Sequence, residues 1–317
     1  MGRSVLSTGE KLQSIWKLGG LTWKQLGVRV WNGIFDDNLL GRAAELAYNF
    51  ILSVFPLFIM LLSIFGLYAS HSSQLRQNLM FYLSRVLPPD AYSVVSHTIS
   101  RLAANSGSGK ITLGIVLTLF FASGGVNTMM STLNGAYEVK EGRSWWKVRL
   151  IAIALTAALT VLIASALILV LVGGTLASFV GAKAGIGPAV ITTWKVAQWP
   201  AVLFFIMFSF SLIYYFGPDV KEQHWYWITP GSVFGVLLWL VASFGFRVYL
   251  GYFNTYSKTY GSLGAVMILL VWLYVTGLAF VIGGEINAQI EHAAAMRGHP
   301  EAKAPGEKVA PADRQAA

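Results

Sequence analysis

Residues 150–172 have the sequence LIAIALTAALTVLIASALILVLV, and this stretch decides the fold class. It contains no charged residue, no glycine and no proline. A helix needs about 20 consecutive apolar residues to cross a bilayer, so the stretch is long enough to span a membrane. A strand of a transmembrane β-barrel would alternate apolar and polar residues over segments of about ten. The continuous run therefore predicts a membrane-spanning α-helix and argues against a barrel.

The rest of the chain has the same character as this stretch. Of its 317 residues, 55% are hydrophobic and only 12% are charged, whereas a soluble domain has about 25% charged residues. This composition excludes a water-soluble globular protein. Hydropathy in windows of about 19 residues predicts an all-α, polytopic membrane protein with six transmembrane helices. The spans are expected near residues 43–69, 111–134, 149–172, 196–216, 229–250 and 261–288.

The distribution of Lys and Arg predicts the orientation. Fifteen of these residues lie in the two tails and in the loops on the same side of the membrane, against seven on the other side. Because basic flanks are retained in the cytoplasm, both termini are expected there. The net charge of +9 is typical of basic loops that face anionic lipid headgroups. We therefore expect membrane lipids, and no nucleic acid, as partners.

The predicted spans divide the chain into three parts. These are a cytoplasmic N-terminal segment (1–42), a six-helix membrane domain (43–292) with an outer loop at 71–110, and a disordered cytoplasmic tail (293–317). The tail is expected to be disordered because it is rich in Ala, Pro, Glu and Lys and has few apolar residues to bury. In the outer loop, helically spaced apolar residues are interrupted by Pro88 and Pro89, which predicts a helical hairpin.

An amphipathic helix is predicted over residues 21–35. Its apolar face would carry Trp23, Leu26, Val30 and Ile34. Such a helix is typical of a segment that lies on the inner leaflet of the membrane. Three polar residues, 36–38, would end it.

Motifs for catalysis or metal binding are missing from the sequence. The chain has no cysteine, which excludes disulfides and thiolate chemistry, and its five histidines are scattered singly. No phosphate-binding glycine loop, zinc-protease motif or nucleophile elbow occurs. We therefore expect no cofactor, no metal and no enzymatic activity.

Polar residues form stripes along three of the predicted spans. Glu45, Asn49 and Ser53 share one helix face, and Asn127 and Ser131 continue a stripe in the second span, because residues four apart lie one above the other. Ionised groups inside a bilayer are costly and mark functional sites by default. One interpretation is that a polar groove opens to the cell interior and that the two glutamates face one another or a basic residue across it; its lining would be Glu45, Asn49, Ser53, Asn127 and Glu285. The other is that the two glutamates reach the headgroup region.

Prolines and glycines interrupt the same spans. Pro56 removes a backbone donor in mid-membrane, which is tolerated only against another helix or a wet cavity. The candidate hinge positions are Pro56, Gly124, Gly125, Gly283 and Gly284. Close helix packing is the alternative explanation for the two glycine pairs.

Two basic residues are candidates for contact with an anionic headgroup on the outer side. Arg247 lies near the outer end of the fifth span, and Lys258 lies in the polar connection 254–262. Alternatively, Arg247 extends to the membrane surface and the connection is an ordinary capped loop.

Four stretches together resemble the YihY/virulence factor BrkB family, once labelled ribonuclease BN. They are 42–57 (RAAELAYNFILSVFPL), 127–146, 260–274 (YGSLGAVMILLVWLY) and 283–288 (GGEINA). The resemblance covers residues 25–292 and implies a multi-pass bacterial inner-membrane protein with six spans. It implies no agreed catalytic residues. The ribonuclease label conflicts with the absence of a clustered ligand set.

The leading hypothesis is a transporter or flippase-like protein for an amphipathic, lipid-related molecule. The candidate substrate-binding residues are Glu45, Asn49, Ser53, Asn127, Ser131, Arg247, Lys258, Glu285 and Asn287. The alternative is a non-transporting envelope scaffold or assembly factor, in which the polar stripes serve helix packing. Both hypotheses allow for a homo-oligomer.

Overall fold

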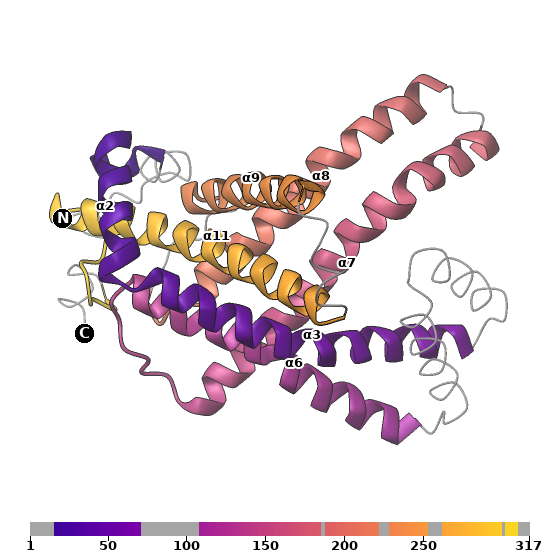
Figure 1. The fold of residues 1–317 in the computed structure, drawn as a ribbon, viewed down its shortest axis with the longest axis horizontal. Coiled ribbons are helices and arrows are strands. Elements are labelled where there is room, and N and C mark those ends of the chain that lie inside the picture. Colours follow the sequence, from indigo (N-terminus) through magenta and orange to yellow (C-terminus); the bar gives the residue numbers. More distant parts are fainter. Residues whose placement is uncertain are drawn as a thin grey trace, which may run out of the picture. The chain divides into compact units, whose positions relative to one another are not determined.

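The structure, a computed structural model, describes residues 16–70, 108–184, 188–221, 228–252, 262–299 and 302–309. Over these ranges the regular secondary structure is helical and contains no strand, as the sequence predicts. The elements in chain order (Figure 1) are η1 (Leu18–Gly20), α2 (Trp23–Asp36), α3 (Leu39–Ser70), α6 (Ser108–Ala136), α7 (Trp145–Ala184), α8 (Pro188–Phe216), α9 (Pro230–Tyr252) and α11 (Ser262–Met296).

The chain divides into two compact units. The larger unit comprises residues 1–48 and 126–317, and the smaller comprises residues 49–125. Both α3 and α6 contribute residues to each unit. In the larger unit α7 packs along α8, α9 packs along α11, and α2 and η1 pack on α11.

Four segments within the described ranges are long and apolar enough to cross a membrane. They are Trp145–Ala166, Thr192–Phe216, Pro230–Leu250 and Val266–Met296. These segments correspond to the last four spans expected from hydropathy. α3 and α6 cover the first two expected spans as helices, and their crossing of the membrane stays a prediction. The outer hairpin expected at 71–110 lies almost entirely outside the described residues.

The first helix after the η1 turn, α2, begins with a capping box. The amide of Gln25 donates to the Thr22 hydroxyl at 3.3 Å, and the Thr22 amide donates to the Gln25 side chain at 3.0 Å. This reciprocal pair satisfies two amides that have no partner within the helix. The helix ends at Asp36, and Asn38 then adopts a φ of 51°, a conformation that Asn tolerates better than most residues. The polar residues 36–38 thus separate α2 from α3.

The apolar face of α2 packs on protein, which corrects the expectation that it lies on lipid. Leu26 and Val30 are buried in a cluster with Ile286 and Ile290 of α11. Trp31 and Phe35 are exposed instead and stack edge to face with ring centroids 5.6 Å apart. A helix with a buried face and a second, aromatic face can bind α11 and still contact a membrane.

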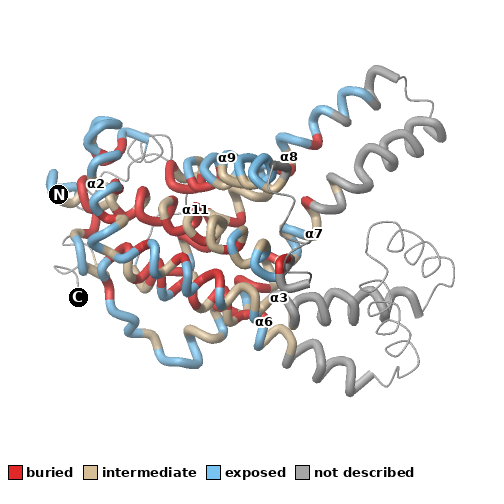
Figure 2. The backbone as a smooth tube through the Cα atoms, in the orientation of Figure 1, coloured by how far each residue is buried: buried red, intermediate tan, exposed pale blue. Residues whose placement is uncertain are grey.

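The burial of α11 is concentrated toward its C-terminal end (Figure 2). There, Gly283 allows the backbone of α11 to approach α9 closely, since a methyl group at this position would lie 2.6 Å from the Gly231 carbonyl. Tyr214 of α8 stacks on Phe280 with ring centroids 5.1 Å apart and donates its hydroxyl to the Phe280 carbonyl at 2.7 Å. This close packing fixes the C-terminal half of α11 against α8 and α9.

Part of the C-terminal tail is ordered, which corrects the expectation that 293–317 is disordered. Residues 293–296 complete α11. The Gly306 amide donates to the Tyr137 carbonyl at 3.2 Å, and the Lys308 carbonyl accepts from the Lys221 amide at 2.8 Å. Composition missed this because backbone hydrogen bonds to neighbouring loops, rather than apolar burial, hold these residues.

Candidate functional site

Glu285 is the most deeply buried acidic residue among those that the structure describes. Its relative exposure is 0%, and it lies in α11 within the candidate span Val266–Met296. Gln289, one turn further along α11, donates its side-chain amide to Glu285 Oε1 at 2.8 Å. No residue of the described ranges donates a hydrogen bond to the other carboxylate oxygen, Oε2. A buried carboxylate with one unbonded oxygen is energetically costly, because desolvation is only partly compensated.

Helix α2 covers this carboxylate. A methyl group at Gly33 would lie 2.3 Å from Glu285 Oε1, so only glycine allows α2 to lie this close. The charges that act on Glu285 come from Asp37, Glu138 and Arg42, at the ends of α2 and α6 and the start of α3. Arg42 Nε also donates to the Asp37 carbonyl at 3.0 Å. We call this arrangement of Glu285, Gln289 and Gly33 the Glu285 niche.

A second set of buried polar residues surrounds the C-terminal end of α11. Tyr137 is buried and lies edge to face against His292, with ring centroids 6.2 Å apart. Burial, together with the nearby Glu291 and Glu285 carboxylates, raises the pKa of the Tyr137 hydroxyl well above its usual value. Lys303 of the tail is 2% exposed and pairs with Glu291 at 3.4 Å. The tail therefore contributes a buried cation to the same end of the bundle as the Glu285 niche.

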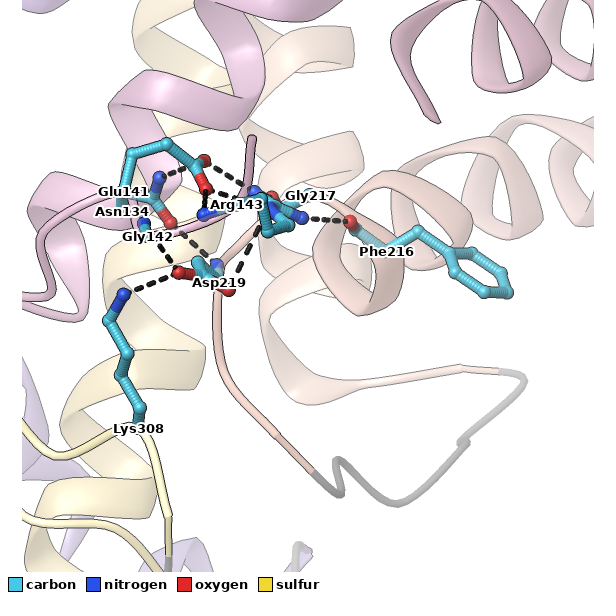
Figure 3. Close-up of polar contacts among 8 residues, drawn as sticks. All are labelled: Asn134, Glu141, Gly142, Arg143, Phe216, Gly217, Asp219 and Lys308. Carbon is cyan, nitrogen blue, oxygen red and sulfur yellow. Dashed lines mark hydrogen bonds and ion pairs between the residues drawn. The ribbon is translucent and has the colours of Figure 1, made fainter. Parts of the chain in front are cut away.

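Loop residues form an ion-pair network between α6, α7, α8 and the tail (Figure 3). Arg143 Nη2 donates to Glu141 Oε2 at 2.7 Å and to the Gly217 carbonyl at 2.8 Å. Asp219 accepts from the Gly142 amide at 2.8 Å and pairs with Lys308. We call this set the loop network; its members are Asn134, Glu141, Gly142, Arg143, Gly217, Asp219 and Lys308.

The loop network has a clear electrostatic consequence at Glu141. Partial burial alone would raise the pKa of this carboxyl, but hydrogen bonds from Arg143 and Asn134 outweigh burial and lower the pKa to about 2. The same Asn134 accepts from the Asp219 amide at 2.6 Å. The network thus ties three separate chain segments together through charge-assisted hydrogen bonds.

The two glutamates predicted in the membrane differ in their exposure. Glu45 is exposed on α3, whereas Glu285 is buried beneath α2. Leu46, the next residue, instead faces α11, where a methyl group on Gly277 would lie 3.2 Å from Leu46 Cβ. A groove shared by Glu45 and Glu285 stays a prediction. Periodicity placed Glu45 on the right helix but could not say which side of α3 packs inward.

Asn287 has a structural partner. Its side-chain oxygen accepts from the Gly231 amide at 2.9 Å, and its side-chain nitrogen donates to the Thr229 hydroxyl at 3.0 Å. Asn287 of α11 therefore binds the N-terminus of α9, where backbone amides have no partner within the helix.

The remaining candidates lie in varied settings. In the smaller unit, the Ser53 hydroxyl accepts from the Gly125 amide at 2.9 Å, and the glycine permits this close approach. Asn127 is half-buried and Ser131 is exposed on α6. Asn49 is half-buried and Pro56 lies inside α3. Gly284 lies against Leu133 of α6, and Lys258 lies outside the described residues.

Arg247 lies in a shallow groove between α9 and α11. The groove has a volume of about 400 Å³ and is lined mainly by apolar side chains of the two helices. Arg247 itself is exposed. None of the residues that line this groove belongs to the Glu285 niche.

The sequence pattern of the BrkB virulence factor family matches residues 30–307. The chain belongs to the BrkB virulence factor family. The resemblance noted in the sequence is therefore confirmed, and the match includes the Glu285 niche and the loop network of this BrkB family member.

This family member is similar to two curated proteins, one of which is named as a membrane protein. The ribonuclease-like protein YfkH of Bacillus subtilis is 34% identical over 251 residues, covering 78% of this chain and 88% of YfkH. A UPF0761 membrane protein of Xanthomonas oryzae is 26% identical over 280 residues, covering 86% of this chain. The aligned part spans 61% of the length of that Xanthomonas relative. No solved structure matches the chain.

Within the described ranges, no group of three or more His, Asp or Glu residues could hold a metal ion.

Sequence reasoning missed several residues of the Glu285 niche. Gln289 could have been found, because it lies four residues after Glu285 and therefore on the same helix face. Gly33 carried no signal, since its role depends on how α2 crosses α11.

Proposed function

We propose that this BrkB family member is a transporter or flippase-like protein of the bacterial inner membrane that moves an amphipathic, lipid-related molecule. Both termini lie in the cytoplasm in this proposal. Glu285 serves as the ionisable residue that couples movement to a proton or another cation. The proposal is non-enzymatic, so the purified protein should not cleave RNA.

One observation carries the proposal. The Glu285 carboxylate is completely buried in a candidate membrane span and has an oxygen to which no residue of the described ranges donates a hydrogen bond. Ionisable groups in such segments are rare, and they often belong to ion pathways or proton relays. The free oxygen can accept a proton or a cation without breaking the bond from Gln289, which uses the other oxygen.

The position of α2 over Glu285 supports a site that opens when this helix moves. Gly33 is the residue of α2 that touches the carboxylate. The helix is held by the apolar cluster with Ile286 and Ile290. A shift of α2 away from α11 would expose Glu285 to the cytoplasm, and its return would occlude the carboxylate.

Reconstitution into liposomes with a fluorescent phospholipid tests this proposal. Glu285→Gln keeps the side-chain volume and the oxygen that accepts from Gln289 but cannot ionise. We expect transbilayer movement of the labelled lipid to slow by about tenfold or more, the size of a typical coupling free energy between sites. The matched control is Asp36→Asn, which removes an exposed acid at the end of α2 and should leave the rate unchanged.

Misfolding is separated from loss of function by measuring the unfolding temperature of each variant in detergent. Glu285→Gln should unfold at or above the temperature of the native protein, because it removes a buried ionisable group. Equal lipid movement by the native protein and Glu285→Gln would remove the acid from the mechanism.

A scaffold or assembly factor is the second candidate function, and a specific observation favours it. Ser53 and Asn287, two residues of the expected polar groove, are bonded to backbone amides of neighbouring helices. Such bonds fit helix packing at about 0.6–2 kcal/mol each. Under this hypothesis no lipid would move, and crosslinking in cells would recover a stoichiometric envelope partner or a second copy of the chain.

The other candidate residues enter the proposal as follows. Polar residues of the first two spans would contact the transported molecule, and the basic residues of the outer side would contact anionic headgroups. The proposed substrate contacts are Glu45, Asn49, Ser53, Asn127, Ser131, Arg247, Lys258 and Asn287, and the proposed hinges are Pro56, Gly124, Gly125, Gly283 and Gly284.

A further inference from the structure

The groove between α9 and α11 has an apolar lining and two polar groups, Ser243 and Arg247, which lie about one helical turn apart on α9. Ser243, Phe246, Arg247 and Leu250 lie on one face of α9, and Ile268, Leu269 and Trp272 of α11 complete the lining. Within the most apolar window of α9, only 11% of the residues are buried inside the protein. The outer surface of α9 is therefore available to the lipid tails that surround a membrane protein.

The two polar groups of the groove lack partners among the described residues. Ser243 Oγ is buried and makes no hydrogen bond, although a helical serine can usually donate to the carbonyl four residues earlier. Arg247 forms no ion pair with an acidic residue of the described ranges. Among the described residues, neither the Ser243 hydroxyl nor the Arg247 guanidinium has a partner, and two such groups beside an apolar groove indicate a ligand that accepts hydrogen bonds.

The spacing of the two groups matches the layers of a glycerophospholipid. Arg247 follows Ser243 by four residues, and a helix rises 1.5 Å per residue, so the two positions differ in depth by about 6 Å. Arg247 lies three residues before the end of the candidate span at Leu250, where a long basic side chain reaches the headgroup layer. Ser243 lies one turn deeper, at the level of ester carbonyls, and the apolar lining is deeper still or alongside.

We propose that this groove binds one anionic phospholipid of the surrounding bilayer. The Arg247 guanidinium donates to the phosphate through its forked N–H groups. The Ser243 hydroxyl donates to an ester carbonyl. One acyl chain runs from the ester level toward the bilayer centre, past Trp272 of the groove lining. The role of this lipid as the molecule that is moved rests on the proposed function, whereas its binding does not.

Lipid binding to the full-length protein in detergent micelles tests the proposal directly. The probes are phosphatidylglycerol and phosphatidylcholine with identical acyl chains, and bound lipid is counted by native mass spectrometry during titration. We expect the native protein to retain phosphatidylglycerol preferentially. Arg247→Gln should weaken phosphatidylglycerol binding about tenfold, as expected for a lost charge-assisted hydrogen bond, and should abolish the preference over phosphatidylcholine.

Two further variants distinguish a built site from general attraction between charges. Ser243→Ala should weaken both lipids to a similar extent, because both carry the ester carbonyl. Lys147→Gln removes an exposed cation at the start of α7 and should leave binding unchanged. The proposal is overturned if Arg247→Gln binds phosphatidylglycerol like the native protein, or if Lys147→Gln loses as much affinity.

The same variants separate this proposal from the proposed function. If Arg247→Gln loses phosphatidylglycerol binding while liposome transport continues at the native rate, the groove is a structural lipid site. If native protein binds the lipid but moves none, the transport function fails and the groove stands.

Discussion

At Gly283 the backbones of α9 and α11 are too close for any side chain to fit between them. A methyl group there would lie 2.3 Å from the Tyr214 hydroxyl and 2.6 Å from the Gly231 carbonyl oxygen. The Tyr214 hydroxyl is itself bonded to the Phe280 carbonyl, so moving it would break a buried hydrogen bond. This close approach is what the packing interpretation of the glycine pair predicts, and a hinge role for it stays a proposal.

Gly283→Ala should therefore destabilise the protein. Overpacking of a well-packed contact costs about 1–3 kcal/mol, and we expect a lower unfolding temperature in detergent. Gly245→Ala in α9 is the matched control, since a methyl group there meets nothing within 4 Å. Alanine is favoured over glycine in a helix by about 0.5–1 kcal/mol, so this variant should be as stable as the native protein or more so. Equal destabilisation by both substitutions would contradict the packing argument.

The role of a residue was predictable from the sequence only where it depends on that residue's own helix and not on which other helices contact it. Glu285 was placed inside the last span by hydropathy, and the structure locates it in the candidate span Val266–Met296. Its contact with Gly33 and the bond from Asn287 to Gly231 depend on which helices meet, which periodicity does not encode.

At the scale of elements, the loop network links segments that are far apart in the chain. Asp219 follows α8, Arg143 precedes α7, and Lys308 belongs to the tail. The sequence signalled only the basic residues of the 135–149 loop, which we used to assign orientation. Their acidic partners were not predicted, because an ion pair between residues far apart in the sequence, such as that between Lys308 and Asp219 at a separation of 89 positions, leaves no local pattern.

This network should make stability depend on acidic pH. In the folded protein the pKa of Glu141 is about 2, against an ordinary value of 4.5. The folded state therefore holds this carboxyl ionised more strongly than the unfolded state does. The stabilisation is fully present above pH 4.5 and is lost as the pH falls from 4.5 toward 2. Because the Glu141 side chain is one-third exposed, solvent screening should keep its contribution below about 1 kcal/mol.

Unfolding temperatures of the native protein and of Glu141→Gln, recorded at pH 7, 4.5 and 3, test this dependence. The native protein should be more stable than the variant at pH 7, and the difference should shrink between pH 4.5 and 3. Asp36→Asn serves as the control, since this exposed acid does not belong to the network. A difference that stays constant over the whole range would show that Glu141 does not contribute through its charge.

At the scale of the whole molecule, composition was sufficient to predict an all-helical membrane protein, and the last four spans agree with the candidate segments. The contacts of α2 and of residues 302–309 were not predictable in the same way. Leu26 and Val30 of α2 have the spacing of a lipid-facing helix, but the same spacing suits packing on Ile286 and Ile290. Hydropathy measures how apolar a face is and does not identify what covers it.

Topology is the remaining whole-molecule prediction, and the absence of cysteine makes it directly testable. Single cysteines would be introduced at Ser73, Ser144, Lys258 and His299 and probed in intact bacteria with a membrane-impermeant maleimide. α7, α8 and α9 separate Ser144 from Lys258. An odd number of spans places these two positions on opposite sides, and basic residues are retained in the cytoplasm, so Ser144→Cys should be protected and Lys258→Cys labelled.

The other two positions test the ends of the predicted topology. α11 separates Lys258 from His299, so His299→Cys should be protected like Ser144→Cys. Ser73→Cys should be labelled, because α3 must cross the membrane if the chain has six spans with its N-terminus inside. All four cysteines should react after the cells are permeabilised. Protection of Ser73→Cys in intact cells, with the other three behaving as expected, would leave the four apolar segments as spans but remove α3 and α6 from the membrane-crossing set.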